Sequence, residues 1–119
     1  CGKHGCIETW LSGPGIGANF QGATTAAVDI VKLAAAGDAE AEAYLQRVED
    51  RLARSFATVI NVLDPDVIVL GGGVSNIERL YANVPPLLPK YVFSEFVETR
   101  VLKNIHGDSS GERGAAWLW

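Results

Sequence analysis

The sequence predicts an α/β fold, and three of its segments carry this prediction. From Asp38 to Leu63 apolar residues recur at steps of three and four, the spacing of an amphipathic helix. The short aliphatic run VIVL at 67–70 is typical of a strand, and VETRVLKNI at 97–105 is expected to form another. Helices that alternate with strands along a chain are typical of the α/β class.

The first 22 residues are expected to hold a short helix followed by a loop. The opening CGKHGC leads into the apolar stretch IETWL and then into SGPGIGANF at 12–20. Gly13, Pro14, Gly15 and Gly17 make that last stretch unfavourable for a regular element, so we expect a loop there.

Two helices are expected next. In TTAAVDIVKLAAAGD at 24–38 a threonine can cap the start, Gly37 can end the helix, and the apolar face consists of Val28, Val31, Leu33 and Ala35. Asp38 is placed to cap the long helix that follows, and Pro65 in LDPD stops it. The apolar face of the long helix comprises Tyr44, Leu45, Val48, Leu52, Phe56, Val59, Ile60 and Leu63, while Glu49 and Asp50 are assigned to its solvated faces.

The segment VIVLGGGVSN at 67–76 is expected to form a strand, a tight turn and a helix start. Its aliphatic residues do not alternate with polar ones, as in a strand buried on both faces. Ser75 or Asn76 is positioned to cap a helix within 77–90, which is interrupted by Pro85, Pro86 and Pro89. A terminal apolar helix is expected in GERGAAWLW at 111–119.

Composition excludes several classes of protein. Of the 119 residues 48% are hydrophobic and 20% are charged, which is typical of a globular chain of at most one domain, here taken as residues 1–119. The net charge is −4 and the ten basic residues are scattered, so no nucleic-acid-binding surface is expected. Apolar runs stay far below the roughly 18 residues of a membrane span, so no membrane partner is expected.

The two cysteines and the missing methionine also carry information. Two cysteines close in sequence do not make the disulfide framework of a small secreted protein, so we expect a reducing, cytoplasmic location. The chain contains no methionine, and its first residue resembles an internal cut, so we expect a fragment of a longer protein.

Gly71, Gly72 and Gly73 are the first candidates for a functional site. They follow a strand at its carboxyl end, where residues without Cβ let a ligand lie against the backbone and the next helix offers unpaired N–H groups. The pattern is neither the phosphate loop GxxxxGKS/T nor the dinucleotide motif GxGxxG. On spacing alone, a nucleotide-sized site and a plain strand-to-helix turn both remain open.

Cys1, Cys6 and Glu8 are the second group of candidates. The C-x4-C spacing is at the edge of the range for zinc ligands, and two reduced thiols without metal are the alternative. His4 lies between the cysteines and could add a ligand or point outward. Glu8 is expected at the start of the short helix, where its carboxylate can stabilise the helix N-terminus or accept hydrogen bonds from a polyol.

Together these pieces resemble the ROK family of repressors, open reading frames and sugar kinases. CGKHGCIE is similar to the end of the family signature C-x-C-G-x-x-G-C-x-E, with Cys1 matching its second cysteine and Cys6 its third. AAAGD, LDPDVIVLGGGVSN and HGDSSGERGAAWLW follow the family's C-terminal order, so the resemblance spans essentially the whole chain. Within the family, the last two motifs look most like bacterial fructokinases of the manno(fructo)kinase type, and N-acetylglucosamine kinases come next.

The resemblance implies part of the C-terminal lobe of the actin-like ATPase (ribonuclease H-like) fold, with ATP and sugar bound between two lobes. It makes Cys1 and Cys6 ligands of one structural Zn²⁺, together with an upstream histidine and cysteine, whereas His4 falls at a variable position. It makes Glu8 a contact to sugar hydroxyls and Gly71, Gly72 and Gly73 the adenosine-binding turn. The aspartate base and the groups that hold Mg²⁺ and the triphosphate belong to the other lobe, so no catalytic residue is expected in this chain.

The activity that the resemblance implies for the full-length protein is ATP-dependent phosphorylation of a hexose, with fructose converted to fructose 6-phosphate. This chain alone is expected to be inactive. An N-acetylglucosamine kinase and a sugar-responsive transcriptional regulator of the same family are the alternatives. A regulator has no need of a close backbone approach at the nucleotide turn, so the three glycines favour a kinase. Apolar faces left uncovered in the chain lead us to expect a homodimer.

Overall fold

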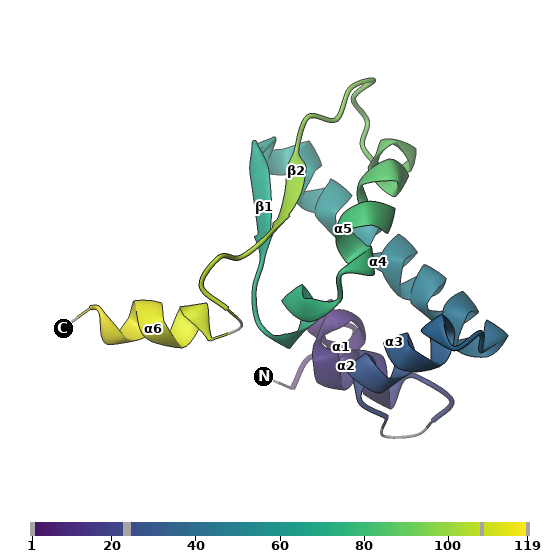
Figure 1. The fold of residues 1–119 in the computed structure, drawn as a ribbon. Coiled ribbons are helices and arrows are strands. Elements are labelled where there is room, and N and C mark those ends of the chain that lie inside the picture. The colour runs from purple at the N-terminus through teal and green to yellow at the C-terminus, as the bar shows by residue number, and fades with distance from the viewer. Residues whose placement is uncertain (1, 23–24, 108, 119) are drawn as a thin grey trace.

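The computed structural model of the chain describes residues 2–22, 25–107 and 109–118 and contains helices, short 3-10 turns and a two-stranded sheet. In chain order the elements are α1 (Glu8–Leu11), α2 (Gly13–Ala18), α3 (Ala27–Ala35), α4 (Ala39–Leu63), β1 (Val67–Leu70), the 3-10 turn η1 (Gly73–Asn76), α5 (Arg79–Asn83), the 3-10 turn η2 (Pro85–Lys90), β2 (Arg100–Lys103) and α6 (Ser110–Ala116). Figure 1 shows α1, α2 and α3 gathered near the start of α4 and the sheet near its end. Within the described ranges, no helix is both long and apolar enough to cross a bilayer.

The long helix α4 is confirmed as predicted. Asp38 caps it, because its Oδ1 accepts hydrogen bonds from the backbone N–H groups of Glu40 and Ala41, both at 2.9 Å. The helix ends at Leu63, and its C-cap residue Asp64 adopts the left-handed conformation (φ 43°) ahead of Pro65. Its buried stripe includes Tyr44, Leu45, Val48, Leu52 and Ile60 as expected, whereas Val59 and Leu63 are 41% and 71% exposed.

Helix α3 is also confirmed, but the face that it buries is different from the predicted one. Gly37 (φ 95°) and Asp38 close its C-terminus with hydrogen bonds to the carbonyls of Ala34 and Leu33, the Schellman arrangement. The predicted threonine cap is wrong, because the residue at the N-cap is Ala26, which provides no side-chain cap. The residues of α3 that pack against the core recur at helical spacing and are Ala27, Ile30, Val31 and Ala34. Val28 (57% exposed) and Leu33 (40% exposed) lie outside this stripe.

The loop predicted in SGPGIGANF is wrong, because most of this segment forms α2. Ser12 caps the helix by accepting a hydrogen bond from the N–H of Gly15 at 3.1 Å, and Pro14 lies in the first turn, where its missing N–H costs nothing. A Cβ at Gly15 would lie 2.7 Å from the carbonyl oxygens of Glu8 and Thr9, and one at Gly17 would lie 2.0 Å from that of Thr25. Two of these glycines therefore permit close packing of α2 against its neighbours rather than break the helix.

Both predicted strands form, and they pair in parallel with Val67 opposite Arg100 and Leu70 opposite Lys103. The chain between them passes through η1, α5 and η2, so the helix of 77–90 is interrupted at the prolines as expected. The prediction that VIVL is buried on both faces is wrong. Ile68 and Leu70 pack against the core, whereas Val69 lies on the opposite face and is 57% exposed. The predicted terminal helix forms as α6, which stands apart from the other helices in Figure 1.

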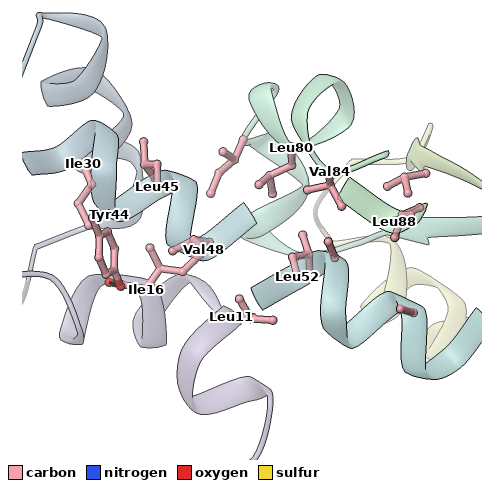
Figure 2. Close-up of a cluster of buried hydrophobic side chains, with 14 of the residues drawn as sticks. Leu11, Ile16, Ile30, Tyr44, Leu45, Val48, Leu52, Leu80, Val84 and Leu88 are labelled. Atoms are coloured by element: carbon pink, nitrogen blue, oxygen red, sulfur yellow. Dashed lines mark hydrogen bonds between the residues drawn. The ribbon is translucent and has the colours of Figure 1, made fainter. Parts of the chain in front are cut away.

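The core is one cluster that follows α4 from end to end. Figure 2 shows Ile16, Ile30, Tyr44 and Leu45 packed where α2, α3 and α4 meet, and Leu80, Val84 and Leu88 gathered beyond Val48. The buried hydroxyl of Tyr44 donates a hydrogen bond to the carbonyl of Ile16 at 2.6 Å, so its burial leaves no unsatisfied polar group at that oxygen. Burial raises the pKa of Tyr44.

The close approach at Gly17 gives a first prediction. Gly17→Ala forces a Cβ against the carbonyl of Thr25, so we expect it to lower the free energy of unfolding by about 3 kcal/mol or more. Gly13→Ala is the matched control in the same helix, because its Cβ meets nothing within 4 Å, and it should change stability by less than about 1 kcal/mol. Urea unfolding of both variants measures the difference. Equal stability of the two variants would contradict the close-packing role of Gly17.

Candidate functional site

The glycine turn leaves β1 with its backbone open to solvent. Gly72 has φ 64° and ψ −170°, a conformation that is essentially restricted to glycine. A Cβ built on Gly71, Gly72 or Gly73 would meet no atom within 4 Å, so nothing in the described chain fills the space over these residues. The turn therefore offers bare backbone at the carboxyl end of a strand, where ligands bind in open α/β sheets.

Ser75 holds this turn from inside. It is fully buried, its hydroxyl donates a hydrogen bond to the carbonyl of Gly72 at 2.7 Å, and its backbone N–H donates to the same oxygen at 3.1 Å. Tyr81 donates in turn to the carbonyl of Ser75 at 2.7 Å, and burial raises the pKa of Tyr81. The predicted capping role of Ser75 or Asn76 is wrong, because both lie within η1, and α5 begins after Glu78 without a side-chain cap.

Asn104 reaches the same turn from the end of β2. Its Nδ2 donates to the carbonyl of Leu70 and to the Oγ of Ser75, both at 3.0 Å. Sequence analysis missed this residue. The signal that could have identified it is its position directly after a predicted strand, since the carboxyl ends of parallel strands meet at one edge of a sheet.

A cluster of charged residues fixes α5, which follows the turn, against α4. Arg79 donates through Nε to Glu49 at 2.5 Å and through Nη1 and Nη2 to Glu42 at 2.7 and 2.8 Å, and Asn83 donates to Glu49 at 2.9 Å. Hydrogen bonding to the Arg79 guanidinium lowers the pKa of Glu42 to about 2, and Glu42 raises the pKa of Arg79 further above its usual range. The prediction that Glu49 lies on a solvated face is wrong, since its carboxylate is buried against Arg79.

Asp50, the other acid assigned to a solvated face, is also engaged. Its carboxylate accepts a hydrogen bond from the hydroxyl of Tyr91 and another from Lys90 at 3.3 Å. The hydrogen bond from Tyr91 is the main cause that lowers the pKa of Asp50. Both Tyr91 and Lys90 lie at the end of η2, so this contact ties η2 to α4 and contributes no residue to the glycine turn.

A hollow of about 450 Å³ brings Glu8 and the glycine turn together. Glu8 is exposed at the first position of α1, as predicted, and Leu52 of α4 also lines the hollow. This volume falls in the range of small-molecule sites. The residues that line the hollow are Ile7, Glu8, Leu11, Ser12, Gly13, Pro14, Leu52, Leu70, Gly71, Gly72, Gly73 and Val74.

A second hollow, of about 310 Å³, lies beside Trp10 and has a different character. The guanidinium of Arg51 stacks over the Trp10 ring, 4.5 Å from its centroid, and the hydroxyls of Ser55 and Thr58 are turned to carbonyls of their own helix. Of its lining residues only Gly5 is a glycine, so it lacks the run of three open glycines found at Gly71, Gly72 and Gly73. The hollow at Gly71, Gly72 and Gly73 is therefore the stronger candidate site.

The cysteine loop is described only in part. Cys1 lies outside the described residues. Cys6 is an exposed free thiol that follows Gly5 and precedes α1. Gly2 (φ 74°) and Gly5 (φ 75°) adopt left-handed conformations that curl the loop. In the part of the chain that the structure describes, no three side chains of His, Cys, Asp or Glu come together as a metal site.

Comparison with known proteins decides the family. The model of the ROK family matches residues 1–119, the whole chain. The chain belongs to the ROK family. The N-acetyl-D-glucosamine kinases of Vibrio vulnificus (strain YJ016) and Aliivibrio fischeri (strain ATCC 700601 / ES114) are 42% and 44% identical to this ROK chain over 121 residues, which is 99% of the chain and 40% of each kinase. The chain thus spans about two fifths of the length of these relatives.

Solved structures confirm the predicted fold class. The ROK family glucokinase from Streptomyces griseus, in complex with glucose and AMPPNP, superposes with a TM-score of 0.80 at 22% identity and covers 99% of this chain and 45% of its own. The ROK hexokinase from Thermus thermophilus superposes with a TM-score of 0.77 at 24% identity and covers 98% and 41%. The fold of this ROK chain is therefore part of the actin-like ATPase fold. The two kinase relatives are named for N-acetylglucosamine, and they give fructose no support.

Proposed function

We propose that the full-length protein containing this chain is an ATP-dependent hexose kinase that phosphorylates N-acetylglucosamine. One observation carries the kinase proposal: Glu8 and the open turn of Gly71, Gly72 and Gly73 line the same hollow, so groups suited to a sugar and to a nucleoside face one space. The identity of 42% and 44% to N-acetylglucosamine kinases supports this sugar over fructose, which the resemblance of the C-terminal motifs favours.

The glycine turn is the proposed contact for the adenosine part of ATP. Bare backbone at Gly71, Gly72 and Gly73 lets a flat base or a ribose approach more closely than any side chain would allow. The Streptomyces griseus relative was solved with AMPPNP, which supports ATP as the phosphoryl donor. Mg²⁺ bound to the triphosphate would neutralise the charge that develops during transfer.

Glu8 is the proposed contact for the sugar. A carboxylate accepts hydrogen bonds through both of its oxygens and can therefore orient two hydroxyl groups of one ring. Glu8 is the first residue of α1, and α2 holds this helix in place. Asn19 ties the two helices together by donating to the carbonyls of Thr9 and Gly15 at 3.0 and 2.8 Å, so the backbone that carries the carboxylate is fixed. The aspartate that would take the proton from the sugar hydroxyl is proposed to lie in the other lobe, outside this chain.

A substrate panel tests the proposed function. The full-length protein is assayed for ADP release with ATP and N-acetylglucosamine, fructose, mannose or glucose. We expect the highest kcat/KM with N-acetylglucosamine. A preference for fructose would overturn the sugar assignment, and absence of ADP release with every sugar would overturn the kinase proposal in favour of a sugar-binding regulator.

Glu8→Gln gives a second prediction for the same enzyme. Loss of charge-assisted hydrogen bonds, each worth roughly 1.5–3 kcal/mol, should lower kcat/KM for the sugar about 10- to 150-fold and leave the KM for ATP nearly unchanged. Glu40→Gln is the matched control, because Glu40 is likewise an exposed acid in the first turn of a helix. If both variants keep the wild-type kcat/KM, Glu8 serves only to stabilise the start of α1.

We also propose that Cys1 and Cys6 bind a structural Zn²⁺ together with ligands upstream of this chain. The free, exposed thiol of Cys6 and the curled backbone at Gly2 and Gly5 support this proposal. Metal analysis after dialysis against a mild chelator should find one zinc per full-length protein and substantially less in Cys6→Ser. Equal zinc content in the two proteins would remove Cys6 from the ligand set.

A further inference from the structure

The glycine turn has no side chains of its own to hold its shape. Each of its three residues lacks a Cβ, and Gly72 occupies a conformation that other residues avoid. Glycine also loses the most conformational freedom when it is ordered, so an ordered turn of three glycines needs hydrogen bonds from outside the turn. The described structure supplies them from Ser75, from Tyr81 and from Asn104.

Asn104 is the member of this group that spans the turn from its entry to its exit. It follows Lys103, which pairs with Leu70 at the carboxyl end of the sheet. Its backbone N–H donates to the carbonyl of Leu70 at 3.3 Å, and its Nδ2 donates to the same carbonyl and to the Oγ of Ser75, both at 3.0 Å. One side chain thus fixes the residue before Gly71 and the second residue after Gly73.

The hydrogen-bond directions in this group permit a single arrangement. The hydroxyl proton of Ser75 is donated to the carbonyl of Gly72, so the Ser75 oxygen can only accept from Asn104. The carbonyl of Leu70 also accepts only. Both hydrogens of the Asn104 amide are therefore used. A carboxylate or a flipped amide would set an acceptor against the carbonyl of Leu70, and it could bond Ser75 only if that hydroxyl turned away from Gly72.

The amide keeps this orientation although its other end is not satisfied. The Oδ1 of Asn104 is buried without a hydrogen-bond partner in the part of the chain that the structure describes. Buried polar atoms usually find partners, so an orientation that leaves one unpaired indicates that the two bonds from Nδ2 dominate. This makes the turn sensitive to the chemistry of position 104 rather than only to its size.

We propose that Asn104 is a positioning residue for the nucleotide: its amide sets the shape of the backbone from Leu70 to Ser75, and this shape determines how well adenosine fits. The proposal rests on the proposed function, since it assigns the turn to ATP. Asn104 lies beneath the turn and acts through Leu70 and Ser75 without touching the ligand itself.

The test compares Asn104→Asp with a matched control in the full-length protein. Asn61→Asp is that control, because Asn61 donates through Nδ2 to the carbonyl of Tyr91 at 3.3 Å, accepts from the N–H of Phe93 at 3.1 Å, and lies away from the turn in the last turn of α4. Each variant exchanges an amide donor for a carboxylate. The measurements are the KM values for ATP and for N-acetylglucosamine, the Kd of AMPPNP by calorimetry, and the melting temperature.

We expect Asn104→Asp to raise the KM for ATP and the Kd of AMPPNP about tenfold or more, with the KM for the sugar within about twofold of wild type. Asn61→Asp should leave all three constants within about twofold. In a Ser75→Ala background the effect of Asn104→Asp should shrink, since Asn104 acts partly through Ser75. Ser75→Ala removes only one oxygen, so it also tests the turn if Asn104→Asp fails to fold, and it should raise the Kd of AMPPNP in the same direction.

An unchanged Kd of AMPPNP in Asn104→Asp would overturn the proposal, and the same result in Ser75→Ala would do so if Asn104→Asp does not fold. Equal increases in the KM values for ATP and for the sugar would also overturn it. So would an equal loss of AMPPNP affinity in Asn61→Asp. Binding of AMPPNP to the wild-type protein separates failure of the Asn104 proposal from failure of the proposed function. A wild-type protein that binds AMPPNP but phosphorylates no sugar contradicts the kinase proposal and still tests Asn104. A wild-type protein that does not bind AMPPNP contradicts both.

Discussion

The apolar stripe of α4 organises the core of this structure, because α1, α3 and η2 all pack against this one helix. Its apolar stripe runs from Tyr44 to Ile60 and contacts α2 and α3 at one end and the segment after β1 at the other. Because the helix spans 25 residues, the elements that pack near its start are held far from those that pack near its end. The ion pairs of Arg79 with Glu42 and Glu49 add a polar attachment beside the apolar one.

The candidate site follows from this arrangement. Glu8 at the start of α1, the glycine turn after β1 and Leu52 of α4 line one hollow. Glu8 and the glycine turn are far apart in sequence, and they lie in different parts of the secondary structure. A displacement of α4 would therefore change the width of the hollow. It would also change the fit of a ligand that touches both Glu8 and the glycine turn.

Local signals predicted much of this fold. Asp38 and Gly37 are a helix cap and a helix stop that depend on neighbouring residues alone, so the sequence was sufficient to place them. Position after a strand and at a helix start makes Gly71, Gly72, Gly73 and Glu8 candidates, the family resemblance adds their ligands, and the structure brings them to one hollow. The role of each toward a ligand stays a prediction.

The features that the sequence did not reveal depend on distant partners. Gly15 and Gly17 have the local pattern of helix breakers, because their contacts with other segments cannot be seen in that pattern. Glu49 was assigned to solvent because its partner Arg79 is 30 residues away. Asn104 was missed because the pairing of β2 with β1, which brings it to the turn 34 residues earlier, is a property of the folded chain.

In the proposed function, the glycine turn and Glu8 face one ligand space that holds nucleotide and sugar together. A crystal structure of the full-length protein with AMPPNP and N-acetylglucosamine tests it most directly. We expect the adenosine in van der Waals contact with the backbone of Gly71, Gly72 and Gly73, and a Glu8 carboxylate oxygen within hydrogen-bond distance of a sugar hydroxyl. Adenosine bound away from this turn, or a sugar bound without contact to Glu8, would contradict it.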